Sequence, residues 1–112
     1  MVSKALVAAS TKPLILSILR FGESYGYQII QRAKEVSGGE LEWSDGMLYP
    51  VLHRLEKDGL IQAQWKQSEK GRMRKYYRIT DAGREALAVE KAQWESVNGA
   101  LTRLWAKPAF SV

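Results

Sequence analysis

Basic side chains gather in one short stretch of the sequence, residues 59–80, and their chemistry is that of a polyanion-binding surface. The stretch holds six Lys or Arg residues against one acidic residue, while the whole chain has a formal net charge of +5. The six are Lys66, Lys70, Arg72, Arg74, Lys75 and Arg78. Because Lys and Arg neutralise phosphates and release condensed counterions, the stretch predicts a nucleic-acid contact. Charge alone also allows a solvated basic loop.

Other residues that could support chemistry are sparse. The sequence has no cysteine, which excludes disulfides, thiolate zinc sites and cysteine nucleophiles. Its single histidine, His53, has no carboxylate, Ser or Cys partner in a recognisable motif, so it is poor evidence for catalysis or metal binding. We therefore expect no cofactor, no metal site and no enzymatic activity, and we interpret His53 as a surface residue or phosphate contact.

Length and composition indicate one compact domain. The chain has 112 residues, of which 46% are hydrophobic and 26% charged, so it can build a core. Apolar runs stay below the roughly 18 to 20 residues of a membrane span, since Lys4, Lys12 and Pro13 interrupt the first part of the chain. We expect no membrane partner and a cytoplasmic location.

Two helices are predicted in the first third of the chain. The first is a core helix with dense apolar residues at 14–19, and residues 11–13 are typical of a helix start. Residues 4–10 could also be helical before it. The second helix is capped by Ser24 and ends at the glycine pair 38–39.

A third helix and a hairpin follow. The helix begins at Ser44 or Asp45, ends at residues 58–59, and has Pro50 near its first turns. Its inward face consists of Leu48, Val51, Leu52 and Leu55. Apolar and polar residues then alternate, which predicts two strands joined by a Gly-containing turn. The strands are 60–66 and 74–80, and the turn is 67–73. We expect Trp43 and Trp65 to pack around this hairpin.

The last predicted helix begins at Thr80 or Asp81 and runs towards Lys107 and Pro108. It carries apolar residues at a and d positions of a heptad pattern, broken at one d position by Glu90. This heptad stripe consists of Leu87, Trp94, Val97, Leu101 and Leu104. We expect it to form the interface of a homodimer. Packing on the core of the same chain is the alternative.

Three helices followed by a two-stranded hairpin describe a winged helix-turn-helix. We therefore expect a mainly α (α+β) fold, with a DNA-binding domain over residues 1–80 and a long C-terminal dimerisation helix and tail over 81–112. The third helix would enter the major groove of double-stranded DNA. Its expected outward residues are Ser44, Met47, Tyr49, His53, Arg54 and Lys57.

Several motifs together resemble the PadR family of transcriptional regulators. They are MLYPVLHRLEKDGLI from Met47 to Ile61, Gly71-Arg72, RKYYRIT from Arg74 to Thr80, Gly83, and Tyr25-Gly26-Tyr27. The resemblance spans about residues 13–107. It implies a dimeric, mostly repressing DNA-binding protein whose last helix supplies the subunit interface, and a single C-terminal helix is similar to the short subgroup of the family.

The resemblance also implies roles for individual residues. The wing residues expected to contact a groove or the backbone are Arg72, Arg74 and Lys75. Tyr49 would contact DNA, although it could instead pack against the second helix. Met47 departs from the family pattern, which more often has a small hydroxyl residue at this place. Some short members resemble multidrug-sensing repressors, in which aromatic residues of the last helix stack flat ligands. Trp94 lies where such a residue would bind a small aromatic or drug-like effector, or it fills the dimer core.

Two classes of function remain at this point. The leading hypothesis is a sequence-specific repressor bound to a DNA operator as a homodimer, and the alternative is a non-specific or architectural nucleic-acid-binding protein. Both lose affinity with salt, but only a specific regulator keeps a preference of about 10³ or more for one site.

Overall fold

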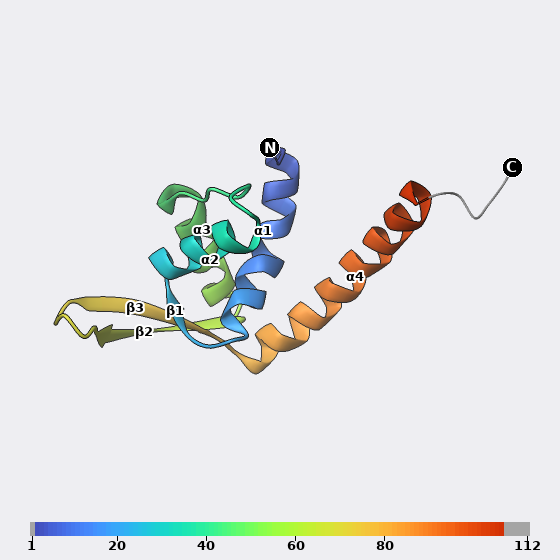
Figure 1. The fold of residues 1–112 in the computed structure, drawn as a ribbon. Helices are drawn as coiled ribbons and strands as arrows, with labels where there is room; N and C mark the ends of the chain where they lie inside the picture. Colours follow the sequence, from blue (N-terminus) through green and yellow to red (C-terminus); the bar gives the residue numbers. More distant parts are fainter. Residues whose placement is uncertain (1, 107–112) are drawn as a thin grey trace, which may run out of the picture.

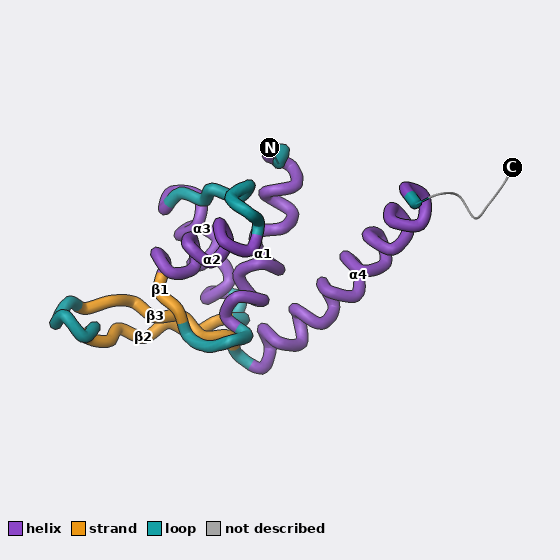
Figure 2. The backbone as a smooth tube through the Cα atoms, in the orientation of Figure 1, coloured by secondary structure: helices purple, strands orange, loops and turns teal. Residues whose placement is uncertain are grey.

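The computed structural model describes residues 2–106 as four helices and one small antiparallel sheet (Figures 1 and 2). The elements are α1 (Lys4–Leu19), β1 (Ser24–Tyr25), α2 (Gly26–Val36), α3 (Asp45–Lys57), β2 (Ile61–Gln67), β3 (Met73–Ile79) and α4 (Asp81–Trp105). This confirms the mainly α winged helix-turn-helix with a long C-terminal helix. The end of the expected C-terminal segment, residues 107–112, lies outside the described residues.

The first helix begins before the expected start, because Ser3 caps it. The Ser3 side chain accepts a hydrogen bond from the Leu6 amide at 3.2 Å, and the helix continues through Pro13. A proline inside a helix removes one backbone hydrogen bond. The Ser10 and Thr11 hydroxyls donate to backbone carbonyls one turn back, in the same region of the helix. Residues 4–10 are therefore helical and continuous with the core helix, which is the longer of the two predicted forms of this helix.

A short strand, β1, takes the place of the expected cap of the second helix. Ser24 pairs with Tyr77 and Tyr25 with Tyr76 of β3, so Ser24 is extended and α2 begins at Gly26. The hairpin strands pair as predicted, with Ile61 opposite Ile79 and Trp65 opposite Lys75. The third helix also matches its prediction, since the Ser44 side chain caps it and Pro50 lies in its second turn.

One core joins all four helices and the sheet. Its buried hydrophobic residues are Ile15, Leu16, Leu19, Ile29, Ala33, Leu41, Trp43, Leu48, Leu52, Leu55, Ile61, Tyr77, Ile79 and Leu87. Trp43 therefore packs as predicted, but the prediction for Trp65 is wrong, because its side chain is 62% exposed. The hairpin extends past the helices, as Figure 1 shows, and no helix covers it there.

The start of α4 is fixed against the turn between α3 and β2. The Thr80 amide donates to the Leu60 carbonyl at 3.0 Å, and the Thr80 hydroxyl donates to the Gly59 carbonyl at 2.7 Å. Gly83 lies so close to this turn that a Cβ atom there would be 2.1 Å from the Leu60 carbonyl oxygen. The first turn of α4 is thus held by hydrogen bonds and by close backbone packing that only a glycine at position 83 allows. Beyond it, α4 extends away from the body on the side opposite to the hairpin (Figure 1).

We predict that Gly83→Ala lowers the free energy of unfolding by about 2 to 3 kcal/mol, because the new methyl group must displace backbone in a packed junction. Gly99→Ala is the matched control in the same helix. A Cβ there would meet only the flexible end of Arg103, at 3.3 Å. The control should raise the free energy of unfolding by about 0.5 to 1 kcal/mol, since alanine favours a helix over glycine. Urea unfolding at one fixed protein concentration measures both, and equal effects would contradict the close approach at Gly83.

Candidate nucleic-acid interface

The exposed face of α3 carries most of the residues expected to reach DNA. Ser44, His53 and Arg54 are all exposed, and the Ser44 hydroxyl accepts a hydrogen bond from the Met47 amide at 3.2 Å as the helix cap. Met47 is different. It is half-buried and packs against the core, with its sulfur 4.0 Å from the Thr11 hydroxyl of α1. The expectation that Met47 points outward is wrong, because its position on α3 faces α1.

Tyr49 has a place that fits both interpretations of its role. Its side chain remains 43% exposed, and its ring also lies against the first residue of α2. A Cβ atom at Gly26 would be 2.3 Å from the Tyr49 hydroxyl oxygen, so this approach requires a glycine. The contact places the Tyr49 ring at the junction of α2 and α3.

The wing, comprising β2, β3 and residues 68–72 between them, is attached to β1 through aromatic rings. The Arg74 guanidinium lies 4.3 Å from the centre of the Tyr25 ring, and the Tyr25 and Tyr76 rings meet edge to face at 5.5 Å. Lys66 forms an ion pair with Glu23 and lies over the Tyr76 ring. Cation–π contacts at partly exposed sites are worth roughly 0.5 to 1 kcal/mol each. Arg74 therefore stabilises the attachment of the wing as well as contributing charge.

The opposite face of the wing is attached to α3. The Lys75 ammonium lies 3.5 Å from the Glu56 carboxylate of α3 and 5.5 Å from the centre of the Tyr77 ring. Burial of Tyr77, with smaller contributions from Tyr49 and Glu56, raises its phenol pKa to about 12. Tyr77 thus stays neutral at neutral pH, as expected of a core residue. Glu56 compensates the charge of Lys75, whereas Arg72 in the turn is exposed and forms no ion pair within residues 2–106.

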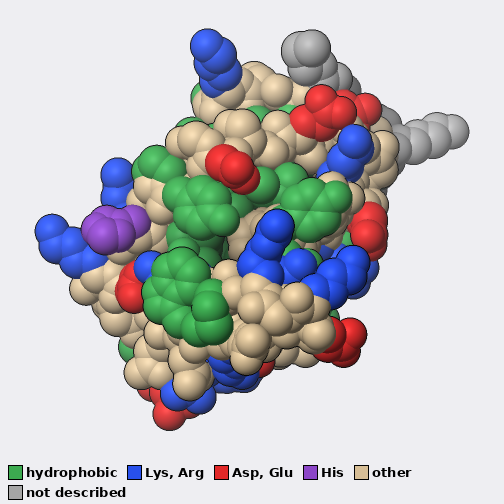
Figure 3. Space-filling view, turned by 90° about the vertical axis from the view of Figure 1, so that its left-hand side faces the viewer, with side chains coloured by type: hydrophobic (Ala, Val, Ile, Leu, Met, Phe, Trp, Pro, Cys, Tyr) green, Lys and Arg blue, Asp and Glu red, His purple; other side chains and the backbone are tan. Residues whose placement is uncertain are grey.

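Together these residues give the molecule a mixed apolar and basic face. Figure 3 shows the side of the molecule that carries the wing tip, with hydrophobic side chains at its centre, and with Lys and Arg side chains and some Asp and Glu side chains around them. The large exposed hydrophobic residues of α2, α3 and the wing are Tyr27, Tyr49, Trp65 and Met73, with Val36 at the end of α2. Such a face suits a ligand that is both anionic and partly apolar.

The heptad stripe divides into a buried and a free part. Leu87 is only 7% exposed and lies in the core of its own chain, so its assignment to the dimer interface is wrong. Glu90, which breaks the pattern, lies 3.6 Å from Lys12 of α1. These contacts hold the first half of α4 against the body. The free part, in contrast, has exposed side chains at Trp94, Val97, Leu101 and Leu104.

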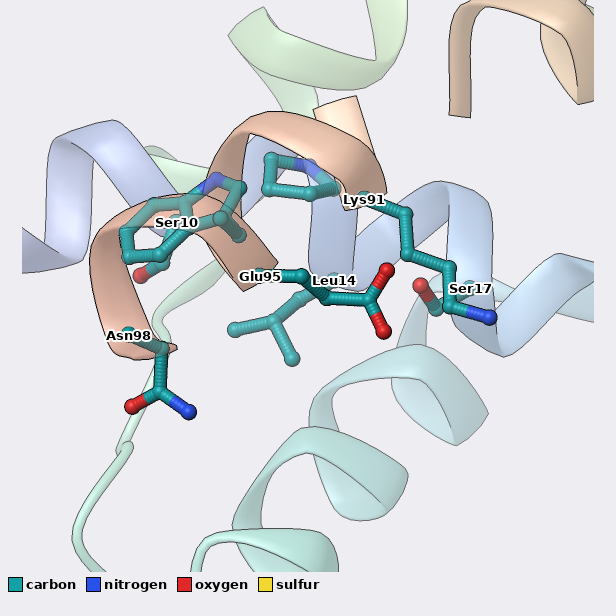
Figure 4. Close-up of a pocket in the computed structure, with 8 residues that line it drawn as sticks. Ser10, Leu14, Ser17, Lys91, Glu95 and Asn98 are labelled. Atoms are coloured by element: carbon teal, nitrogen blue, oxygen red, sulfur yellow. The ribbon is translucent and has the colours of Figure 1, made fainter. Parts of the chain in front are cut away.

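A hollow of about 410 Å³ lies between α1 and the beginning of the free part of α4 (Figure 4). Its lining residues are Ser10, Pro13, Leu14, Ser17, Lys91, Trp94, Glu95 and Asn98. Figure 4 shows Leu14 on α1 facing Glu95 on α4 across the opening. On the α1 side the apolar Pro13 and Leu14 side chains line the hollow together with two serine hydroxyls. On the α4 side the Trp94 ring lies among a carboxylate, an ammonium and an amide.

Neither a metal-binding group nor a membrane-spanning helix occurs in the part of the chain that the structure describes. Within residues 2–106, no three His, Asp or Glu side chains gather into a group that could hold a metal ion. In the same range, no helix combines the length and the apolar character needed to cross a bilayer.

The comparisons with known proteins identify the family. Residues 15–89 match the model of the transcriptional regulator PadR-like family. The chain belongs to this family. As a PadR-like protein it is a DNA-binding transcriptional regulator and not an enzyme.

Individual relatives agree with this PadR-like assignment. The chain is 42% identical over 64 residues to a transcriptional regulator of Mycobacterium tuberculosis, a match that covers 57% of this chain and 59% of the relative. Its fold is similar to a PadR-like transcriptional regulator from Bacillus cereus, with 32% identity and a TM-score of 0.82 over 93% of this chain and 99% of that one. A transcriptional regulator from Clostridium thermocellum gives a TM-score of 0.81 at 28% identity, over 93% and 100% of the two chains.

Sequence reasoning missed the residues that orient the PadR-like wing. Tyr25 was expected at the start of the second helix and Glu23 in the turn before it, yet they contact Arg74 and Lys66 of the hairpin. Glu56 was not singled out either, because its partner Lys75 follows it by 19 residues. Only the pairing of β1 with β3 brings Tyr25 and Glu23 to the wing, and a two-residue strand leaves no periodic signal in a sequence.

Proposed function

We propose that this PadR-like regulator is a sequence-specific repressor that binds its operator as a homodimer. The observation that carries the proposal is the alignment of the exposed face of α3 with an exposed basic wing tip on one side of the molecule (Figure 3). Tyr49, His53 and Arg54 would reach DNA from α3, with Ser44 at its start, and Arg72 would reach the backbone from the wing. Arg74 and Lys75 would orient the wing while adding to its positive potential.

Dimerisation would place two such faces on one DNA. In helix-turn-helix dimers the recognition helices contact half-sites about one helical turn, or 34 Å, apart. A pseudo-palindromic operator is therefore expected. The support for a dimer is the free part of the heptad stripe, since four large apolar side chains at a and d spacing remain exposed along it, from Trp94 at the hollow beside α1 to Leu104.

The first prediction from the proposed function concerns specific binding. We expect the protein to bind DNA from immediately upstream of its own gene at least about 10³-fold more tightly than unrelated DNA of equal length at one moderate salt concentration. Arg72→Ala should weaken binding to both DNAs, and it should reduce the slope of log affinity against log salt by about one unit for each phosphate that Arg72 neutralises. Arg84→Ala, in the first turn of α4 and far from the wing tip, removes the same charge and should leave the slope unchanged. Equal binding to both DNAs, confirmed by random-sequence selection, would favour the non-specific or architectural alternative.

A second prediction concerns the dimer. We expect Leu101→Asp to convert the dimer to monomers, because the dimer would bury an unpaired carboxylate. Thr102→Asp adds the same charge one residue further along α4, outside the heptad stripe, and should remain dimeric. Sedimentation velocity distinguishes the two states, and circular dichroism verifies that both variants remain helical. A dimeric Leu101→Asp protein would show that the interface lies elsewhere.

An effector is the third element of the proposal. A flat aromatic or drug-like molecule would stack on Trp94, whose side chain is 38% exposed at the edge of the hollow between α1 and α4. Such a ligand can release DNA only if it binds one separation of the two DNA-binding faces better than another. The alternative is that Trp94 only fills the dimer core.

We predict that some members of a panel of flat aromatic compounds weaken operator binding at least about 10-fold, as fluorescence anisotropy of labelled operator would show. Trp94→Ala should abolish this effect, while Trp105→Ala, at the other exposed tryptophan of α4, should preserve it. Unchanged operator binding across the panel would contradict an aromatic effector and leave Trp94 as a packing residue.

A further inference from the structure

Trp65 is exposed on the wing in a way that its own fold does not explain. Its side chain is 62% exposed, and it makes no ring stacking or cation contact with any residue in 2–106. The other aromatic residues of the wing, Tyr76 and Tyr77, contact β1 or lie in the core. The wing is therefore attached to the body without any contribution from Trp65.

The register of the hairpin gives Trp65 an apolar neighbour. Trp65 lies opposite Lys75, and Met73 is two residues before Lys75 on the same face of β3. Residues at such diagonal positions of an antiparallel pair are about 7 to 8 Å apart, within reach of long side chains. Met73 is 54% exposed. The two side chains form an exposed apolar pair, here called the wing pair.

The wing pair lies on the α3 side of the wing. Further along the same face, Ile61, Tyr77 and Ile79 are buried in the core. Between these buried residues and Met73, Lys75 is held by the Glu56 carboxylate of α3. The pair therefore continues the surface of the recognition helix outwards, so that a duplex lying along α3 would meet both.

The charges around the wing pair indicate what covers it. The cations nearest the wing pair are Lys70 and Arg72 of the turn, with Glu69 as the single acidic residue of the turn, and Lys75 on the same face. Lys66 and Arg74 are next to the pair in sequence but lie on the other face of the hairpin, where they add to the positive potential of the wing. A protein partner would supply apolar surface, but proteins do not in general carry the negative charge that would match this positive potential. DNA supplies both, because its phosphates match the cations and its sugars and base edges are apolar, and apolar side chains often enter minor grooves between basic ones.

From this arrangement we infer that Trp65 and Met73 contact the sugars and base edges of the DNA groove next to the one that α3 occupies. The inference rests on the proposed DNA-binding function and adds a specificity determinant to it. An apolar wedge selects sequence through the cost of opening a base step, which is lowest at pyrimidine–purine steps. The operator should accordingly prefer such a step under each wing, although no polar side chain reads it.

The test compares three variants on the operator. Trp65→Ala should lower affinity at least about 10-fold, because aromatic contacts to bases are worth that much in other nucleic-acid complexes. Trp65→Phe should recover part of the affinity, and Met73→Ala should have a smaller effect than Trp65→Ala. The salt slope should stay at the wild-type value in all three, since an apolar contact releases no counterion. This separates Trp65 from Arg72, whose replacement changes the slope.

Controls make the result decisive. Phe21→Ala removes another exposed aromatic side chain, next to β1 and away from the wing tip, and should leave affinity unchanged. Unfolding temperatures equal to wild type would show that Trp65→Ala is folded. Random-sequence selection with wild type and Trp65→Ala should give the same sequence under α3, whereas the flexible step under the wing should disappear in the variant.

Two outcomes would overturn the inference. One is a Trp65→Ala protein that binds the operator as wild type does and selects the same flanking sequence. The other is a fall in affinity accompanied by the slope change of an electrostatic contact. Either result, obtained while wild type prefers its operator, leaves the proposed function intact. Failure of wild type itself to prefer any DNA would instead reject the proposed function, and the inference with it.

Discussion

The arrangement of this protein depends on one close approach, between the start of α4 and the turn that joins α3 to β2. Thr80 donates to the carbonyls of Gly59 and Leu60, and Gly83 leaves no room there for a side chain. Four segments meet at this point: the end of the recognition helix α3, the start of β2, the end of β3, and the start of α4. The direction of α4 is consequently fixed relative to the surfaces that would contact DNA.

Charge on the wing is divided between two tasks. Lys66 is paired with Glu23, Lys75 is paired with Glu56, and Arg74 lies over the Tyr25 ring, so these three cations attach the wing to β1 and α3. The side chains of the turn, Arg72 among them, remain for an external partner. A count of basic residues therefore overstates the number of contacts available to DNA, although all of them add to the potential that attracts it.

Periodic features could be predicted from the sequence, and short or non-local ones could not. Alternating residues predicted the hairpin, and the a and d spacing predicted α4. The two-residue strand β1, the contact of Met47 with α1 and the burial of Leu87 all depend on where a distant segment lies. Trp65 is the instructive error, since a large aromatic residue in a strand is usually buried, but here the strand continues beyond the helices that could cover it.

The rigid attachment of α4 has a mechanical consequence. A straight helix of 25 residues is about 37 Å long. Since only its first half rests on the body, its outer half, about 18 Å long, acts as a lever arm. A tilt of roughly 5° at the point where α4 leaves the body would displace the far end by about 1.6 Å. The same geometry works in reverse. A small change in how two such arms cross would alter the spacing of the bodies they carry, with no change inside either body.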